Sequence, residues 1–380
     1  MQPIYLDHAA TTPIADEVVQ AMLPIYQDVV GNASSVHSFG RKARQHLDEA
    51  RRFLAQSIHA IEKEIIFTSG GTEADNLALI GTAKANMHKG RHIITTVQEH
   101  HATLHTAEEL EKQGFTVSYL PVDDTGRVNI EDLEQTLTDE TILVSIMFVN
   151  NETGVIQPIE EIGKLLQSHQ AYFHTDAVQA YGLLDINVDE LGIDLLTTSA
   201  HKINGPKGIG FLYAREGIAI NALSYGGEQE RKRRAGTENI PGVVGFQKAV
   251  ELSMQNRNER LKLYQSYKQI LLQTLTEKNI LFSINGDKDH TIPSIINISF
   301  DGVNVEAMLT NFDLDGVAAS SGSACTAGSV EPSHVLAAMY GEGNPITTNS
   351  IRFSFGSMNS AENIQEASNR IVKVVNRLLK

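Results

Sequence analysis

The chain predicts an α/β fold with a mostly parallel, doubly wound sheet. Across residues 15–252, short apolar runs alternate with amphipathic helical patterns, as repeated βαβ units require. Several of these runs are apolar throughout, which is typical of strands buried on both faces. The length of 380 residues, with 41% hydrophobic content, also allows a second, smaller domain with its own core.

The first domain is expected to contain seven strands. They cover residues 65–68, 92–96, 116–120, 142–148, 172–175, 195–199 and 208–213. Near Asn256 the pattern changes to a long amphipathic helix. Its apolar face carries Leu261, Tyr264, Leu271, Leu272 and Leu275. A second domain is predicted to begin there.

The second domain is expected to mix strands and helices. It offers a strand at 295–300, a helix around 305–312, a strand at 351–355 and a closing helix at 361–379. Between them, residues 320–329 are almost all Gly, Ser and Ala. Such small residues cannot build a core, so this stretch predicts an exposed, flexible loop.

A carboxylate and an amine stand at the downstream ends of two apolar runs. Asp176 ends the run at 171–176, and Lys202 ends the run at 194–202. Because the carboxyl ends of parallel strands open onto one crevice, the two side chains are expected to share a site. A Schiff-base lysine and a carboxylate that holds a pyridine nitrogen protonated are what pyridoxal phosphate needs. The alternative is two ordinary surface charges, which the neighbouring residues disfavour.

A glycine-rich turn at residues 69–72 leads into a helical pattern. Free N–H groups at a helix start bind phosphate well, and glycine lets the backbone approach closely. The turn matches neither a dinucleotide-binding pattern nor a P-loop, which argues against a nucleotide. Ser199 and His201 flank Lys202 and are expected to donate to the same phosphate. Taken alone, the turn is equally compatible with a capped helix that binds nothing.

Other polar side chains also follow expected strands. Gln179 lies three residues after Asp176 and is expected to reach the ring oxygen of the cofactor. Asn151 follows the run at 142–148, and His100 follows the run at 92–96. An imidazole there can stack on a pyridine ring and shuttle protons. Isolated Asn and Gln residues usually form turns, so these assignments depend on the whole cluster.

A metal site is a weaker interpretation. His101 and His105 lie four residues apart on a possible helix, but Ala102 stands where the zinc-binding HExxH motif has glutamate. No carboxylate or thiol cluster completes a site in the sequence. We therefore expect no metal.

The chain has one cysteine, so no internal disulfide can form. Cys325 is then either a small buried hydrophobe or a working thiol. It lies in the expected flexible loop, whereas inert cysteines lie in apolar surroundings. No Lys or Arg is close in sequence, so any activation must come from the site that this thiol enters.

Charge and hydropathy exclude other classes of function. The net charge of -15 argues against direct binding of nucleic acid, which depends on neutralising phosphates. No run approaches the roughly 18 apolar residues of a membrane span. The start of the chain lacks a basic region followed by an apolar one, so we expect a cytoplasmic protein.

Together, these motifs resemble those of the cysteine desulfurases of the NifS/IscS-like group, class V aminotransferase relatives with the type I pyridoxal phosphate fold. The resemblance covers nearly the whole chain. It is carried by residues 5–13, 70–73, 99–100, 150–152, 176–179, 199–202, 234–237, 320–325 and 351–356. The loop around Cys325 is similar to the branch with a long, mobile cysteine loop.

The resemblance implies a large cofactor-binding domain of residues 15–255. A smaller domain of residues 1–14 and 256–380 would carry the cysteine loop, at about 320–333. The implied cofactor is pyridoxal 5'-phosphate, held by Gly71, Thr72, His100, Asn151, Asp176, Gln179, Ser199, His201, Lys202 and Thr237.

The resemblance also implies individual roles. Lys202 would form the Schiff base and move protons, Asp176 would pair with the pyridinium, and His100 would stack on the ring. Thr237 would reach the phosphate of the neighbouring subunit's cofactor, which implies a homodimer. Asn151 and Arg352 would hold the substrate carboxylate, with Arg352 as a bidentate clamp.

The implied reaction converts L-cysteine to L-alanine, with a persulfide formed on Cys325. An acceptor protein would take the sulfur: a tRNA thiouridylase, an iron–sulfur scaffold, or both. The chain ends soon after its last expected helix, without the tail by which some relatives dock a scaffold, so tRNA thiolation is favoured. Alternatives are a selenocysteine lyase, a class V aminotransferase, or a cofactor-binding regulatory protein without turnover.

Overall fold

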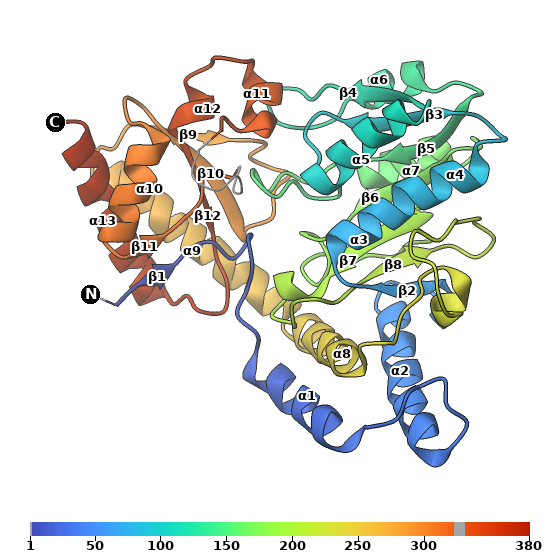
Figure 1. Cartoon of the computed structure of the whole chain (residues 1–380). Coiled ribbons are helices and arrows are strands. Elements are labelled where there is room, and N and C mark those ends of the chain that lie inside the picture. The colour runs from blue at the N-terminus through green and yellow to red at the C-terminus, as the bar shows by residue number, and fades with distance from the viewer. Residues whose placement is uncertain (1, 323–330) are drawn as a thin grey trace.

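A seven-stranded sheet lies at the centre of the larger part of the chain in the computed structural model, which describes residues 2–322 and 331–380 (Figure 1). Its strands lie in the order β2-β8-β7-β6-β5-β3-β4. They are β2 (Ile65–Thr68), β3 (His92–Thr96), β4 (Thr116–Leu120), β5 (Thr141–Ser145), β6 (Tyr172–Asp176), β7 (Leu195–Ser199) and β8 (Gly210–Ala214). All neighbours pair in parallel except β8, which is antiparallel to both β2 and β7.

All seven expected strands are present, with two differences in detail. β5 ends at Ser145 rather than at residue 148, because its last pair with β3 joins Ile94 to Val144. Beyond that point the stretch is still hydrogen-bonded to β6, through Ile146 N to His174 O and Phe148 N to Asp176 O, but no longer pairs with β3. The strand expected at 208–213 runs against its neighbours, because the link from β7 is too short for the crossover that a parallel strand needs.

Helices cover both faces of this sheet, as a doubly wound fold requires. One face packs against α3 (Gly71–Asn76), the π-helical turn Leu77–Gly81 that continues it, α4 (Thr82–Asn86) and α5 (His101–Lys112). The other packs against α1 (Asp16–Asp28), α2 (Ser38–Gln56), α6 (Ile130–Thr136), α7 (Ile159–Leu166) and α8 (Ile240–Gln255). Apolar side chains that alternate along each strand enter the two cores in turn.

A second body is built on an antiparallel sheet in the order β12-β10-β9. Its strands are β9 (Phe282–Asn285), β10 (Ile295–Phe300) and β12 (Ser350–Ser354). Its helices are α9 (Arg257–Glu277), α10 (Val305–Leu314), α11 (His334–Tyr340), α12 (Ile346–Asn349) and α13 (Ala361–Leu378). The sequence pattern missed β9, whose half-exposed residues lack a continuous apolar run.

The chain begins in this second body, and α1 then follows in the larger one (Figure 1). β1 (Ile4–Tyr5) pairs in parallel with β11 (Val317–Ala318), and Ile4 and Leu6 enter the same core as the α9 residues Tyr264 and Leu271. The domain boundaries that the sequence suggested, 15–255 against 1–14 with 256–380, remain a proposal, which this separate core supports.

An internal ion pair fixes a strained turn at the edge of the larger body. Arg51 donates two hydrogen bonds to Glu230, of 2.6 and 2.7 Å, and both side chains are buried. Glu230, Arg231 and Lys232 all have positive φ, which costs conformational energy in residues other than glycine. The pair therefore holds in place the turn that leads to Arg234 and Thr237.

Replacing Glu230 by alanine is expected to lower the free energy of unfolding by about 3–5 kcal/mol, because it leaves the Arg51 cation buried and unpaired. The matched control is Glu228→Ala, which removes an exposed partner of Lys232 and should cost at most about 1 kcal/mol. The urea midpoint of each variant measures both effects. Equal losses from the two variants would rule out a structural role for the buried pair.

No helix among the described residues is long and apolar enough to cross a membrane.

Candidate active site

A cavity of about 290 Å³ lies where the strands of the large sheet end. Asp176 is the last residue of β6, and Lys202 ends the 3-10 turn Ala200–Lys202 that follows β7. Thr72 lies in the first turn of α3, and His100 caps the start of α5. The cavity is lined by Ala9, Ala10, Gly71, Thr72, Asp75, His100, Met147, Val149, Asn151, Asp176, Val178, Gln179, Ser199, His201, Lys202, Gly322 and Arg352.

Lys202 lines this cavity, and its amine is hydrogen-bonded to the segment at residues 9–10. Its Nζ donates to the carbonyl oxygens of Ala9, at 2.5 Å, and Ala10, at 2.9 Å. Burial and the nearby Arg352 guanidinium lower the pKa of Lys202 from 10.5 to about 8, although Asp176 acts in the opposite direction. A larger share of this amine is therefore neutral near pH 8 than in an ordinary lysine.

This pKa predicts how fast Lys202 reacts with acetic anhydride in cofactor-free protein. Only the neutral amine is acylated, so labelling should rise with pH to half its maximum near pH 8, rather than near 10.5. Arg352→Gln removes one cause of the shift and should move the midpoint upward. Mass spectrometry of the Lys202 peptide gives the profile, and a wild-type midpoint near 10.5 would disprove the lowered pKa.

Asp176 and Asp75 form a coupled buried pair on one wall. The Asp176 carboxylate accepts a hydrogen bond of 2.9 Å from the Val178 N–H, and burial raises its pKa to about 6. Asp75 is 1% exposed, and burial together with the charge of Asp176 raises its pKa well above the usual value. Since the two charges repel, the site disfavours having both carboxyls ionised at once.

His174 is a buried neighbour of Asp75. Its Nε2 lies 3.6 Å from Asp75 Oδ1, and burial lowers the pKa of His174 to about 3. The ring is therefore neutral, and it also contacts Ser145 and Thr197 at 2.8 and 3.1 Å. No positive charge from His174 offsets the two carboxyls.

His100 lines the same cavity as Lys202. Its Nδ1 accepts a hydrogen bond of 3.1 Å from the Ala102 N–H, which fixes the ring and leaves the proton of the neutral imidazole on Nε2. Although the residue as a whole is exposed, partial burial of its ring and the nearby Lys202 lower the pKa of His100 to about 4. The ring is therefore neutral and available for stacking.

A second hollow of about 330 Å³ adjoins the first and shares Gly71, Thr72, Ser199 and His201 with it. Its other lining residues are Thr11, Ser69, Gly70, Glu73, Lys207 and Gly208. The first N–H groups of α3 have no partner within the helix, whose first ladder bond runs from Ala74 N to Gly70 O. Hydroxyls, an imidazole and an ammonium thus surround a helix start, which is the donor set that a phosphate requires.

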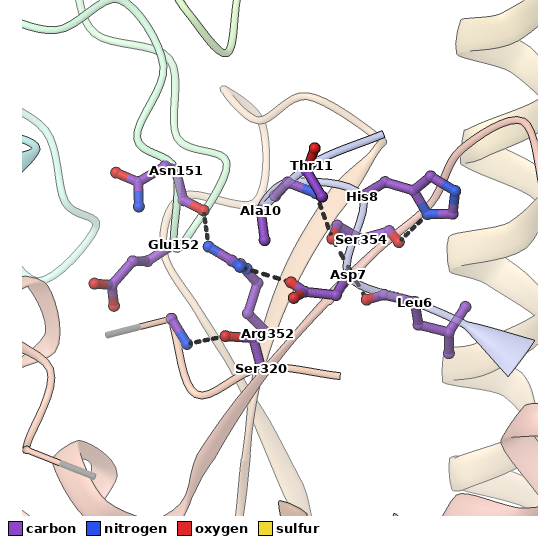
Figure 2. Close-up of polar contacts among 12 residues, drawn as sticks. Leu6, Asp7, His8, Ala10, Thr11, Asn151, Glu152, Ser320, Arg352 and Ser354 are labelled. Atoms are coloured by element: carbon purple, nitrogen blue, oxygen red, sulfur yellow. Dashed lines mark hydrogen bonds and ion pairs between the residues drawn. The ribbon is translucent and has the colours of Figure 1, made fainter. Parts of the chain in front are cut away.

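Arg352 lines the first cavity but not this hollow, and Figure 2 shows its side chain between Asn151 and Asp7. It is 3% exposed, and it donates from Nη1 to the Asn151 carbonyl oxygen at 3.0 Å and from Nη2 to Asp7 at 2.7 Å. Among the described residues, Arg352 Nε and Asn151 Oδ1 are buried without a hydrogen-bond partner. Unpaired buried polar atoms of this kind indicate a ligand that supplies the missing contacts.

Three of the expected site residues make no contact here that tests their predicted roles. Gln179 lines the cavity, but its amide donates to Ala9 O at 3.0 Å. Thr237 is exposed and lies outside both hollows, so within one chain it does not reach the phosphate donors. Cys325 lies outside the described residues.

Several lining residues were missed by the sequence analysis. Asp75 stands three residues after Thr72, a spacing that places two side chains on one helix face and could have identified it. Lys207 and the carbonyl groups of Ala9 and Ala10 carried no comparable local signal. Asp75, His100 and Asp176 also place potential metal-ligand atoms within 4.8 Å of one another. This group lies within the same cavity wall, so we assign it to the cofactor site.

The residues present fit pyridoxal phosphate. The unpaired Asp75 and Asn151 oxygens, the free helix start and the partly neutral Lys202 lie around a single cavity. Gly71 belongs to that fit, because a Cβ there would meet Val178 at 3.0 Å. Asp176 would hold the ring nitrogen, and Thr72, Ser199 and His201 would hold the phosphate.

The chain is similar over its whole length to curated proteins named as cysteine desulfurases. The family model described as "Aminotransferase class-V" matches residues 4–366. The "Putative cysteine desulfurase IscS 1" of Bacillus subtilis (strain 168) is 57% identical over 378 residues, covering 100% of both chains. The "Cysteine desulfurase IscS" of Clostridium botulinum (strain Hall) is 46% identical, covering 98% of this chain and 94% of that protein.

Solved structures show the same fold. A "NIFS-LIKE PROTEIN" matches with a TM-score of 0.93 and 33% identity, covering 99% of this chain and all of the other. A structure described as "SspA in complex with cysteine" matches with a TM-score of 0.81 and 35% identity, covering 92% and 98%. The chain therefore belongs to the class-V aminotransferase family, as a pyridoxal phosphate-dependent cysteine desulfurase of the NifS/IscS-like group.

Proposed function

We propose that the enzyme moves the sulfur of L-cysteine onto Cys325 and then passes it to an acceptor protein, releasing L-alanine. One observation carries this proposal: a lysine of lowered pKa and a buried carboxylate face the same cavity. The bonds balance without an external oxidant or reductant. The carbon–sulfur bond of the substrate breaks, a sulfur–sulfur bond forms at Cys325, and one proton moves from the thiol to the alanine carbon.

The residues that line the cavity support the proposed cofactor contacts. Lys202 would carry the cofactor, Asp176 would hold the ring nitrogen, His100 would stack on the ring and Gln179 would meet the ring oxygen. Gly71, Thr72, Ser199 and His201 would bind the phosphate, and Asn151 would lie beside the ring. When bound, pyridoxal phosphate supplies an aldehyde that condenses with amines and a ring that withdraws electrons from the adjoining carbon.

Lys202 is the proposed general base and acid. Its pKa of about 8 lets the neutral amine take the Cα proton of the substrate near neutral pH and later return a proton to the product. Because the pKa of Asp176 is about 6, its carboxylate is mostly charged near neutral pH, so a protonated ring nitrogen would have an anionic partner. His100, neutral at this pH, is placed to relay a proton at Nε2.

The carboxylate of L-cysteine is proposed to bind at Arg352 and Asn151. Arg352 Nε and Asn151 Oδ1 are both buried and have no hydrogen-bond partner among the described residues. A carboxylate held there would fix the direction in which the amino acid lies in the cavity. Orientation of this kind removes much of the entropic part of a reaction barrier.

Cys325 is the proposed sulfur acceptor within the enzyme. This assignment comes from the sequence, in which it is the single cysteine. As a thiolate it attacks the substrate sulfur, and the resulting persulfide is the form in which sulfur leaves. A tRNA thiouridylase and an iron–sulfur scaffold are both compatible with such a donor.

We also propose a homodimer in which Thr237 completes the neighbouring subunit's phosphate site. Its exposed position, outside its own chain's hollows, supports this arrangement. Exposed apolar side chains at Tyr26, Val30, Val36 and Phe39 offer surface for such an interface.

Incubation of the holoenzyme with L-cysteine and a thiol reductant tests the proposed function. We expect alanine and sulfide in equal amounts, with no requirement for a keto acid. A strict requirement for a keto acid would identify an aminotransferase. Turnover of L-selenocysteine alone would identify a selenocysteine lyase.

A further inference from the structure

The cation at the substrate end of the cavity already has an anionic partner. Arg352 is on β12, and its backbone is fixed on one side by hydrogen bonds of 2.7 and 3.3 Å with Ser320. Its guanidinium meets the Asp7 carboxylate at 2.7 Å. The side chains of Arg352 and Asp7 are 3% and 20% exposed, so water screens this pair only weakly.

The position of Asp7 is fixed by the segment that carries it (Figure 2). Ser354 N donates to Leu6 O at 2.8 Å, and Ala9 N donates to Ser354 Oγ at 2.8 Å. The His8 ring lies so close to Gly356 that a Cβ there would overlap it. Asp7 is therefore held against β12 by bonds on both sides, unlike a surface side chain that pairs by chance.

We propose that Asp7 is an internal counter-ion that competes with the carboxylate of the amino acid for Arg352, and so sets how tightly the enzyme binds its substrate. This inference rests on the proposed role of Arg352 as the carboxylate ligand. Without a ligand, Asp7 stabilises a cation whose burial is otherwise costly. When the substrate arrives, its carboxylate either displaces Asp7, which then loses its cationic partner, or lies beside it, which places two anions at one cation.

The competition has a defined consequence for binding. Asp7 and the substrate carboxylate compete for the same guanidinium, so each weakens the binding of the other by the same free energy. The stronger the ion pair between Asp7 and Arg352, the weaker the binding of the substrate carboxylate. Asn at position 7 keeps an oxygen that accepts the Arg352 hydrogen bond but carries no charge. Asp7→Asn should therefore strengthen carboxylate binding without releasing Arg352 from its position.

The experiment compares L-alanine with L-alaninamide as competitive inhibitors of L-cysteine turnover by the holoenzyme. Both carry the amine, but only alanine carries the carboxylate. In Asp7→Asn, the inhibition constant of alanine should fall at least about fivefold, the low end of common coupling between ligands, while that of alaninamide stays the same. Asp315→Asn is the matched control, since it removes a carboxylate that pairs with Arg377 and Lys373.

The outcomes separate this inference from the proposed function. If wild-type enzyme binds alanine no better than alaninamide, and Arg352→Gln changes neither, the role of Arg352 fails and this inference fails with it. Suppose instead that Arg352→Gln abolishes the preference for alanine over alaninamide, while Asp7→Asn leaves this preference unchanged or weakens it. Only the inference about Asp7 is then overturned. Should Asp7→Asn not fold, Asp7→Ser removes the same charge and is expected to give the same selective gain.

Discussion

Lys202→Ala is expected to lower alanine formation from L-cysteine by at least about 10⁴-fold, since the residue is both the attachment point of the cofactor and the general base. No other ammonium group is hydrogen-bonded within the cavity that the described residues line. The loss should appear in kcat, because Arg352 and Asn151 still hold the substrate. Assays of alanine at saturating L-cysteine measure it.

Chemical rescue makes this prediction specific. A small amine such as methylamine fits the space that the Lys202 side chain leaves and should restore part of the rate in Lys202→Ala. Lys268→Ala is the matched control: this lysine is half-buried on α9 and has a lowered pKa, but it lies outside the cavity. Full activity in Lys202→Ala, or an equal loss in Lys268→Ala, would exclude the assignment.

Cys325→Ala is expected to abolish sulfur transfer to an acceptor protein while leaving binding of L-cysteine intact. The residue contributes the sulfur that receives the substrate sulfur, whereas the carboxylate and amine of the substrate are held elsewhere. Radiolabelled sulfur on an acceptor protein measures transfer, and a spectral titration of the bound cofactor measures binding. Cys325→Ser keeps the size of the side chain and should fail in the same way.

The single cysteine makes this test quantitative. Because the chain contains no other thiol, any persulfide found on wild-type protein after L-cysteine is added reports on Cys325 alone. We expect up to one persulfide per chain in the wild type and none in either variant. Normal transfer by Cys325→Ala would show that sulfur leaves by another route.

The sheet and most of its functional ends were predictable because their signals are local. A run such as Leu195–Ser199 is apolar enough to be buried on both faces, and parallel strands bring the residues after their carboxyl ends to one edge of the sheet. Strand order along the chain is therefore enough to place Lys202 and Asp176 in one cavity. The direction of β8 was not predictable in this way, because it depends on whether the segment between β7 and β8 is long enough for the crossover that a parallel strand needs.

Contacts between distant segments were not predictable. Asp7 and Arg352 are 345 residues apart, and neither neighbourhood indicates the other. The carbonyl oxygens of Ala9 and Ala10 that accept from Lys202 belong to a segment whose course depends on β12 and β11. The pairing of Asp75 with Asp176 likewise arises only once α3 packs across the sheet.

The most direct test of the central claim is to locate the cofactor on the chain. The holoenzyme is treated with sodium borohydride, digested and mapped by mass spectrometry. We expect the reduced pyridoxyl group on the peptide that contains Lys202 and on no other lysine. A label on a different residue, or an unlabelled Lys202 peptide from fully loaded enzyme, would contradict the account.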